Sequence, residues 1–583
     1  MEQDEKFDNQ FNLALDLTKE ERERSEDLNA GYDQTFDRWE IIFRYAGDLK
    51  TLKKSSTTNI EPLSMGYAIA YMKENDLEAF SRNEQVIFIE KPKNLLLNRQ
   101  VSISASCMLS VKNTPLSLTG RGVFVAVIDT GIDIFHSDFI NENGDTKIYE
   151  LWDQTISGIP PRPFINGTLY TRKEINAAIH SENGRQMFQS RDDLGHGTHV
   201  ASICAGRNGV APEAELIVVK LGDISKQGFP RTTQLMTALQ YVIDTAIREN
   251  RPVAVNISYG HNYGDHRGNS LLETFVSQIA GQWKSSICIG TGNEGNSGRH
   301  KQGKITTKTE LILFDVAPFE QNLNLQIWKD FVDEFKIRLE SPSGITYTIV
   351  DQQGKSQYTY KDTTVYVYNG YSTPYNVRQE LYFSFIPMEG NYIESGQWKI
   401  EISPVNIKNG EYQMWLPVSA GSNPETRFLE PDKVFTLTIP STARNVISVG
   451  AYDVRYQAYA DFSGRGDQKF CVDKPDLVAP GVGILAAAVG GGESVRSGTS
   501  MATPFVTGSA ALLMEWGIVR GNDPFLYGEK VKAYLRRGAR ELPGFEKYPN
   551  REVGYGEDVI IRLHWRKSVK SSVSVHFPNT ETK

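Results

Sequence analysis

Short apolar runs, each ending near Gly, Asp or Asn, alternate with helical stretches from about residue 120 to residue 298. The same pattern resumes near residue 446 and continues to about residue 562. A strand that is buried on both faces of a parallel sheet carries apolar residues at consecutive positions. The pattern therefore predicts an α/β fold with a doubly wound parallel sheet. The runs that carry this prediction are Phe124–Ile128, Leu216–Val219, Val253–Val255 and Val446–Gly450.

The segment between Lys304 and about Leu429 has a different pattern, in which apolar and polar residues alternate between turns. This pattern predicts an inserted β-sandwich of antiparallel strands. We expect exposed tyrosines on it, which permit a carbohydrate- or protein-binding role, although alternating aromatic residues on strands more often cover a sheet face. These tyrosines are Tyr358, Tyr360, Tyr366 and Tyr368. The expected strands include Glu310–Asp315, Leu323–Trp328, Lys336–Leu339, Thr364–Tyr368, Glu380–Phe385 and Trp398–Ile402.

The first hundred residues predict a small module of mixed helices and strands. Thr18–Glu21 matches a capping box at a helix start, and Gly66–Tyr71 and Gln85–Glu90 are typical of strands. The expected organisation is an N-terminal module, an α/β domain in two parts, the sandwich inserted between these parts, and a short tail. The corresponding boundaries are 1–100, 101–303 with 436–565, 304–435 and 566–583.

Composition excludes several classes of protein. The net charge of -8 argues against nucleic acid or an anionic membrane surface as the main partner. No apolar stretch is long enough to span a bilayer, and the acidic, polar start Met1–Glu5 lacks the pattern of a secretory signal. We therefore expect cytoplasmic synthesis without membrane insertion. The four cysteines form no C-x-x-C pair, which argues against a disulfide framework and a zinc knuckle.

Three short motifs place reactive side chains at strand or helix ends. Asp129 directly follows a buried apolar run, where α/β sheets hold functional groups, although an Asp in such a turn is most often a backbone acceptor. His196 precedes a helical stretch in the sequence GHGTHV. With His199 it could form a metal-binding pair, but no acidic or cysteine partner is suggested nearby. Ser500 lies in SGTSMATP, at an expected helix start.

Together these side chains can supply nucleophilic catalysis. A serine hydroxyl is a poor nucleophile until an imidazole takes its proton, and the imidazole needs a carboxylate that fixes its tautomer. Ser500, His196 and Asp129 match these three requirements. Asn293, in the glycine-rich turn GTGNEG, can donate to a developing oxyanion, although taken alone it would be interpreted as stabilising the turn.

The motifs resemble those of the subtilases, the subtilisin-like serine proteases of peptidase family S8, whose catalytic residues follow the same chain order. The resemblance covers about residues 115–297 and 436–562. It implies that Asp129 orients and stabilises the imidazolium, that His196 is general base and acid, and that Ser500 is the nucleophile. It also implies an oxyanion hole made by Asn293 and the Ser500 backbone N–H, in an enzyme that requires no cofactor for catalysis.

The same resemblance identifies a substrate-binding strand and a segment that precedes the serine. The strand is Asn256–Gly260, whose main chain would pair with an extended peptide, and the segment is Lys474–Gly481. The expected substrate-binding residues are Ser258, Tyr259, Gly260 and Gly292.

Several neighbouring residues are expected to be structural. These are His199, Asp133 and His136, with Cys204 as a packed thiol. Many subtilases bind structural calcium, and Asn141–Asp145 is a candidate for this here. It lacks the full acidic loop pattern, so an exposed turn is the preferred interpretation and the metal content stays unknown.

An N-terminal prodomain, a long insertion and no signal sequence are together similar to the Csp proteases of clostridial spores. That resemblance implies a jelly-roll insertion, a cleaved prodomain that stays bound, deposition in the spore, and a cortex-lytic proenzyme as the partner activated at germination. We expect self-processing near Gln100-Val101, with Leu95–Leu97 in subsites upstream of the cut. The alternative for this segment is a plain linker.

The predicted function is a serine endopeptidase that cleaves polypeptides through an acyl-enzyme. The alternative is a catalytically silent Csp-like pseudoprotease that acts as a germinant sensor or scaffold, because some Csp-like chains have lost residues of the triad. In this sequence all three triad residues and Asn293 are present, which favours the enzyme.

Overall fold

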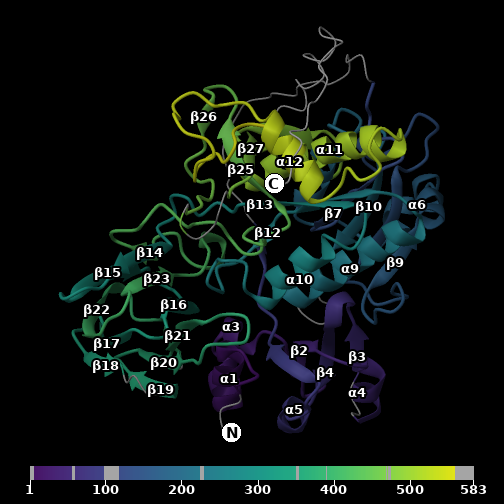
Figure 1. The fold of residues 1–583 in the computed structure, drawn as a ribbon. Coiled ribbons are helices and arrows are strands. Elements are labelled where there is room, and N and C mark those ends of the chain that lie inside the picture. Colours follow the sequence, from purple (N-terminus) through teal and green to yellow (C-terminus); the bar gives the residue numbers. More distant parts are fainter. Residues whose placement is uncertain are drawn as a thin grey trace, which may run out of the picture.

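A computed structural model describes residues 5–55, 59–97, 117–222, 229–349, 353–388, 390–467, 469 and 474–558. The described residues form an N-terminal unit, a central α/β unit and an inserted β unit (Figure 1). The N-terminal unit lies against α9 and α10 of the central unit and also beside the inserted unit (Figure 1).

The N-terminal unit is an antiparallel sheet in the order β1-β2-β4-β3, with β5 also paired to β2. The capping box at Thr18 is present, since its side chain accepts from the Glu21 N–H while the Glu21 carboxylate accepts from the Thr18 N–H. Its elements are α1 (Asn9–Asp16), α2 (Lys19–Glu23), α3 (Glu26–Asn29), β1 (Tyr32–Asp33), β2 (Arg38–Tyr45), α4 (Leu49–Ser55), β3 (Asn59–Pro62), η1 (Ser64–Gly66), β4 (Tyr67–Met72), α5 (Glu74–Ser81), β5 (Val86–Glu90) and β6 (Leu96–Leu97).

The doubly wound sheet expected for the central unit is confirmed. Its strands follow the order β26-β25-β13-β11-β7-β10-β8-β9, with β27 beside β25, and the pairs from β25 to β8 are parallel. The strands are β7 (Phe124–Asp129), β8 (Ile148–Asp153), β9 (Thr168–Thr171), β10 (Glu215–Lys220), β11 (Val253–Ile257), β13 (Ser285–Gly290), β25 (Ile447–Asp453), β26 (Ala458–Tyr459) and β27 (Leu477–Pro480).

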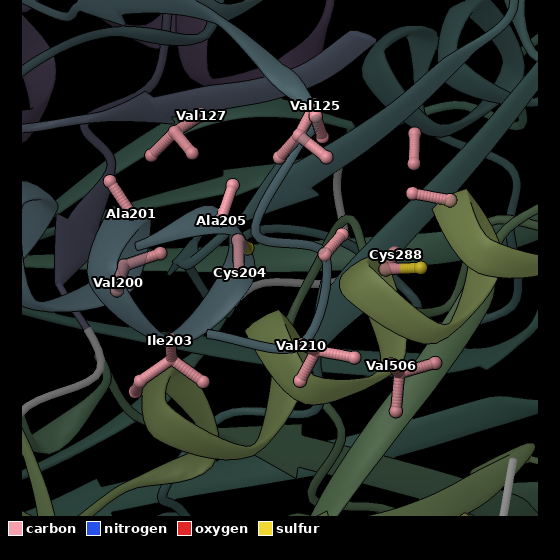
Figure 2. Packing of buried hydrophobic residues seen from close by; sticks show 14 of the residues in the cluster. Val125, Val127, Val200, Ala201, Ile203, Cys204, Ala205, Val210, Cys288 and Val506 are labelled. Atoms are coloured by element: carbon pink, nitrogen blue, oxygen red, sulfur yellow. The ribbon is translucent and has the colours of Figure 1, made fainter. Parts of the chain in front are cut away.

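Helices cover both faces of this sheet, which explains the continuous apolar runs. Along β7, Val125 and Val127 face α8 and α11, whereas Phe124, Ala126 and Ile128 face α9 and α10. Figure 2 shows the first of these cores, where α8, α11 and Cys288 of β13 meet β7. The remaining elements of the unit are η2 (Ser137–Phe139), α6 (Arg172–Ile179), α7 (Gly184–Met187), α8 (His196–Ala205), α9 (Thr232–Arg248), β12 (Tyr259–Gly260), α10 (Leu271–Ile279), β28 (Ile484–Ala487), β29 (Glu493–Arg496), α11 (Thr499–Met514), η4 (Glu515–Val519) and α12 (Glu529–Gly538).

Helix α11 is long and rich in apolar residues. Together with η4 it is long and apolar enough by composition to cross a membrane. However, 78% of its most apolar 18-residue stretch is buried inside the fold. It therefore serves as the core helix against which α8 and the central strands pack.

The inserted unit is a sandwich of two antiparallel sheets, in the orders β14-β23-β16-β21-β20-β19 and β18-β17-β22-β15-β24. Apolar side chains of both sheets meet in one core around Trp398. The first strand begins at His300, before the predicted boundary at residue 304. The elements are β14 (His300–Lys304), β15 (Glu310–Val316), β16 (Leu323–Asp330), β17 (Glu334–Glu340), β18 (Thr346–Ile349), β19 (Gly354–Thr359), β20 (Thr363–Asn369), β21 (Arg378–Pro387), β22 (Gly396–Asn406), β23 (Glu411–Trp415), η3 (Ser419–Gly421) and β24 (Arg427–Phe428).

The expectation that the sandwich tyrosines are exposed is wrong. Tyr358 and Tyr360 are buried in the core between the two sheets. Tyr366 and Tyr368 are buried in a second core, where the sandwich packs against the N-terminal unit. Side chains that alternate along β20 are buried on both of its faces. Tyr366 and Tyr368 therefore hold the sandwich and the N-terminal unit together and offer no free binding surface.

Candidate active site

Asp129 and His196 form a buried pair at the carboxyl edge of the central sheet. Asp129 ends β7 and His196 begins α8, and the His196 Nδ1–H donates to Asp129 Oδ1 at 2.6 Å. Both side chains are almost completely buried. Because the carboxylate accepts at Nδ1, the lone pair of the ring is at Nε2, which has no hydrogen-bond partner among the described residues. His196 is thus held in the tautomer that accepts a proton at Nε2.

Asp192 locks this pair in position. Its Oδ1 accepts from Thr130 Oγ1 at 2.7 Å and from the Gly195 N–H at 2.9 Å. Its Oδ2 accepts from the N–H and Oγ1 of Thr198, at 2.8 and 2.7 Å. The carboxylate therefore caps the start of α8 and ties it to the turn after β7.

Close backbone contact supports the same arrangement at Gly197. A Cβ at this position would lie 2.2 Å from the carbonyl oxygen of Gly131, so only glycine lets α8 begin so near the turn that follows Asp129.

Ser500 lies in the first turn of α11. Gly498 precedes it with a φ of 143°, a backbone conformation that favours glycine, and its N–H donates to the Gly481 carbonyl. The N-termini of α8 and α11 both lie at the carboxyl edge of the sheet, and the two helices pack side by side in the core that contains Cys204 and Val506 (Figure 2).

Asn293 follows β13 and contacts the residue before Ser500. Its Oδ1 accepts from the Thr499 N–H at 3.0 Å and from Thr499 Oγ1 at 3.3 Å. This orientation leaves Nδ2 as the remaining donor, and Nδ2 is buried without a hydrogen-bond partner in the part of the chain that the structure describes. A buried, unpaired N–H of a residue that contacts Thr499, the neighbour of Ser500, is suited to a developing oxyanion.

The end of the N-terminal unit lies on the expected substrate-binding strand. β6 pairs antiparallel with β12, with Tyr259 opposite Leu97 and Gly260 opposite Leu96. The Leu95 N–H donates to the Pro230 carbonyl on the other side. The segment thus runs extended between β12 and the backbone at Pro230, at the edge that carries Asp129, His196 and Asn293. Gln100 and Val101 lie outside the described residues.

The two other residues expected to bind substrate are adjacent to this strand. The Ser258 hydroxyl accepts from Asn256 Nδ2 at 3.1 Å, between β11 and β12. Gly260 and Gly292 both lie against Thr438. A Cβ would be 2.6 Å from Thr438 Oγ1 at Gly260 and 2.4 Å from Thr438 Cγ2 at Gly292, which explains the two glycines.

His199, His136 and Asp133 have structural contacts. His199 Nε2 lies 3.1 and 3.0 Å from the carbonyls of Ile484 and Ser494, and burial lowers the pKa of His199 to about 3. His136 Nε2 lies 2.9 Å from the Gly492 carbonyl, and Asp133 Oδ2 accepts from the Gly490 N–H. These contacts position the β28–β29 hairpin beside α8.

The two remaining candidates, Cys204 and the turn Asn141–Asp145, make structural contacts. Burial raises the pKa of the Cys204 thiol, which lies in the core of Figure 2. Asn141 Oδ1 accepts from the N–H groups of Asn143 and Asp145 within its own turn. The described residues contain no group of three or more His, Cys, Asp or Glu side chains that could hold a metal ion.

Two contributors to this site were not predicted from the sequence. Asp192 precedes Gly195 by three residues, and an Asp shortly before a helix is a capping signal that could have identified it. Pro230, which pairs with the N-terminal segment, has no comparable local signal, because its partner Leu95 is far away in the sequence.

Comparison with known proteins shows which family this chain is similar to. Residues 120–311 and 384–556 match the model of the subtilase family, and residues 5–93 match the Csp protease B prodomain. The structure of the Clostridium perfringens CspB protease aligns with a TM-score of 0.72 at 36% sequence identity, over 78% of this chain and 94% of that chain.

Two curated relatives cover most of this chain at lower identity. The PII-type proteinase of Lacticaseibacillus paracasei is 23% identical over 528 residues, which are 81% of this chain and 27% of the relative. The minor extracellular protease Vpr of Bacillus subtilis is 23% identical over 457 residues, which are 76% of this chain and 51% of the relative. The chain thus spans about a quarter of the first and half of the second.

Proposed function

Because this chain belongs to the subtilase family, we propose that it is a serine endopeptidase with Ser500 as the nucleophile. The observation that carries the proposal is the buried His196–Asp129 hydrogen bond, which leaves His196 Nε2 as a proton acceptor. The unpaired Nδ2 of Asn293 supports it independently, since charge on a substrate oxygen needs such a donor.

The proposed reaction uses these residues as follows. His196 Nε2 takes the Ser500 hydroxyl proton while Oγ attacks the peptide carbonyl carbon, and Asn293 Nδ2 with the Ser500 N–H stabilises the charge on the carbonyl oxygen. The C–N bond then breaks, and the leaving amine receives the proton from His196. Water attacks the acyl-enzyme by the same proton transfers and releases the acid and Ser500. Asp129 stabilises the imidazolium in both halves.

The test is labelling with an active-site fluorophosphonate, which forms a bond only with an activated serine. We expect stoichiometric labelling of the wild-type protein once its cleaved prodomain has dissociated, and none of Ser500→Ala. Loss of this nucleophile should remove about 10⁶ in turnover, the magnitude known for subtilisin itself. A wild-type protein that stays unlabelled after its prodomain has been removed would favour the pseudoprotease alternative.

We also propose that the enzyme cuts its own prodomain near Gln100-Val101 and retains the fragment. The pairing of Leu96 and Leu97 with β12 supports this, because it brings the chain to the catalytic edge as an extended strand. Arg231 of the catalytic domain pairs with Glu40 of the prodomain at 2.8 Å. A fragment held in this way would occlude the site.

Retention is further supported by polar contacts outside the cleft. Asp27 of the prodomain accepts from Tyr263 Oη at 2.5 Å and from Asn324 Nδ2 at 2.7 Å, and Asn9 Nδ2 donates to Glu380 Oε2 at 2.9 Å. Wild-type protein expressed alone should therefore run as two copurifying chains, and Ser500→Ala as one. An uncut wild-type chain with demonstrated activity on peptides would refute self-processing but not the triad.

For the substrate, we propose a cortex-lytic proenzyme activated at spore germination, with the protease made in the cytoplasm and deposited in the spore. The resemblance to the Csp proteases supports this role. The test is incubation with the cortex-lytic proenzyme of the same organism and N-terminal sequencing of the product. Cleavage by the wild type but not by Ser500→Ala is expected; an uncut proenzyme under conditions in which peptides are cleaved would refute it.

A further inference from the structure

Two adjacent leucines of the segment that crosses the active edge face opposite sides. Leu95 is fully buried and belongs to the apolar core of the α/β unit, with α9 and β11. Leu96 is the next residue and is 4% exposed, but it is not part of that core. Alternate side chains of an extended strand point in opposite directions, so another part of the molecule must cover Leu96.

The cover is a turn of the inserted sandwich. Gly421 ends the short helix η3 (Ser419–Gly421), and a Cβ placed on it would lie 2.8 Å from Leu96 Cδ1, 3.7 Å from Cδ2 and 3.9 Å from Cγ. These are the three nearest atoms to that position, and all belong to one leucine side chain. The bare backbone of Gly421 therefore makes the space that the branched end of Leu96 fills.

The turn is fixed to the catalytic domain beside the oxyanion residue. The Ser419 N–H donates to both carboxylate oxygens of Glu294, at 3.2 and 3.1 Å, and Ser419 Oγ donates to Oε1 at 2.9 Å. Glu294 directly follows Asn293. The buried Arg299 holds the next residues, with Nη1 donating to Ser422 Oγ and Nη2 to the Asn423 carbonyl. A wall anchored in this way is rigid relative to the active site.

We infer that the inserted domain builds a substrate subsite, with Gly421 as the residue that sets its size. The subsite takes a branched aliphatic side chain of leucine size at the substrate position opposite Gly260. This inference rests on the proposed function, because it treats the prodomain segment as a bound substrate. A change of one methylene in an apolar pocket changes specificity by about 10–200-fold, which is the range expected here.

The experiment uses the full chain and its own cleavage as the readout. Gly421→Val places a side chain where Leu96 lies, and should slow self-processing by about 10-fold or more in a timed cell-free translation read by intact mass. The backbone at Gly421 does not have a positive φ, so valine is tolerated there apart from the contact with Leu96. Leu96→Ala removes all three atoms that conflict, so the double variant should process faster than Gly421→Val alone.

The matched control is Ala420→Val, which enlarges an exposed side chain of the same turn and should process at the wild-type rate. Processing of Gly421→Val at the wild-type rate, or a defect that Leu96→Ala does not relieve, would overturn the subsite. Fluorophosphonate labelling of the same variants distinguishes failure of the subsite inference from failure of the catalytic assignment. A wild-type chain that neither cuts itself nor reacts with the probe would overturn the proposed function, and the subsite with it.

Discussion

Asp192→Asn should loosen the active site without touching any residue of the triad. The two carboxylate oxygens of Asp192 accept from the backbone N–H groups of Gly195 and Thr198 and from two threonine hydroxyls. In the asparagine variant one oxygen becomes an NH₂ group that faces such donors. A hydroxyl can rotate to accept from it, but the adjacent backbone N–H cannot, so one buried donor loses its partner.

The expected loss of stability follows from the backbone N–H that is left without an acceptor. A buried donor without a partner costs about 1–3 kcal/mol, so Asp192→Asn should lower the free energy of unfolding by that amount. Asp192→Ala orphans both N–H groups, and should cost roughly twice as much. Since Asp192 holds the start of α8 against the turn after Asp129, the His196 ring should shift. A misplacement of about 1 Å costs on the order of 10²-fold in rate.

Two measurements check this reasoning. Urea unfolding in the Ser500→Ala background gives the stability without interference from proteolysis, and the rate of fluorophosphonate labelling in the Ser500 background gives the reactivity. The matched control is Asp193→Asn, because Asp193 is adjacent but its side chain is 74% exposed. Asp192→Asn with the stability and labelling rate of the Asp193→Asn control would refute the claim that this carboxylate positions His196.

Three further predictions concern other groups. Asn293→Ala removes one expected oxyanion donor and should lower turnover about 10²–10³-fold, so turnover within a few-fold of wild type would count against that role. Glu61 lies with Glu40 in a cavity between the prodomain and Arg231, and burial, with the nearby charge of Glu40, raises the pKa of Glu61 to about 8. The bound state then holds more protons than the released state, so release of the cleaved prodomain on gel filtration should increase between about pH 5 and pH 8. Glu61→Gln should flatten this dependence, and release that falls with pH would contradict it. Burial raises the pKa of the Cys204 thiol, so iodoacetamide should modify Cys204 only after unfolding; rapid modification of the native protein would show that this core opens.

The inserted sandwich contacts the prodomain both next to the candidate active site and away from it. The sandwich covers Leu96 through Gly421, and its sheet buries Tyr366 and Tyr368 against the prodomain. It therefore contacts both the central α/β unit and the segment that pairs with β12. We expect that deleting it would open the proposed subsite and remove part of the surface that binds the prodomain, even though Asp129, His196 and Ser500 lie outside it.

The sequence by itself determined the elements whose signals are local. The apolar run of β7 predicted a strand buried on both faces, and the run has that form because Val125 and Phe124 face two different layers of helices. The motifs around Asp129, His196 and Ser500 predicted side chains at a strand end and at two helix starts, which is where the structure has them. The capping box at Thr18 is equally local.

Only the tertiary structure decided which distant segments meet. The tyrosines expected to be exposed on the sandwich are buried. Tyr358 and Tyr360 fill the core between its two sheets, and docking of the prodomain covers Tyr366 and Tyr368. Leu96 packs against Gly421, and Asp192 accepts hydrogen bonds from both Thr130 and Thr198. No periodicity along the chain encodes these contacts. A hydrophobic or polar pattern specifies that a side chain needs a partner, but the partner itself is chosen by how the folded units pack together.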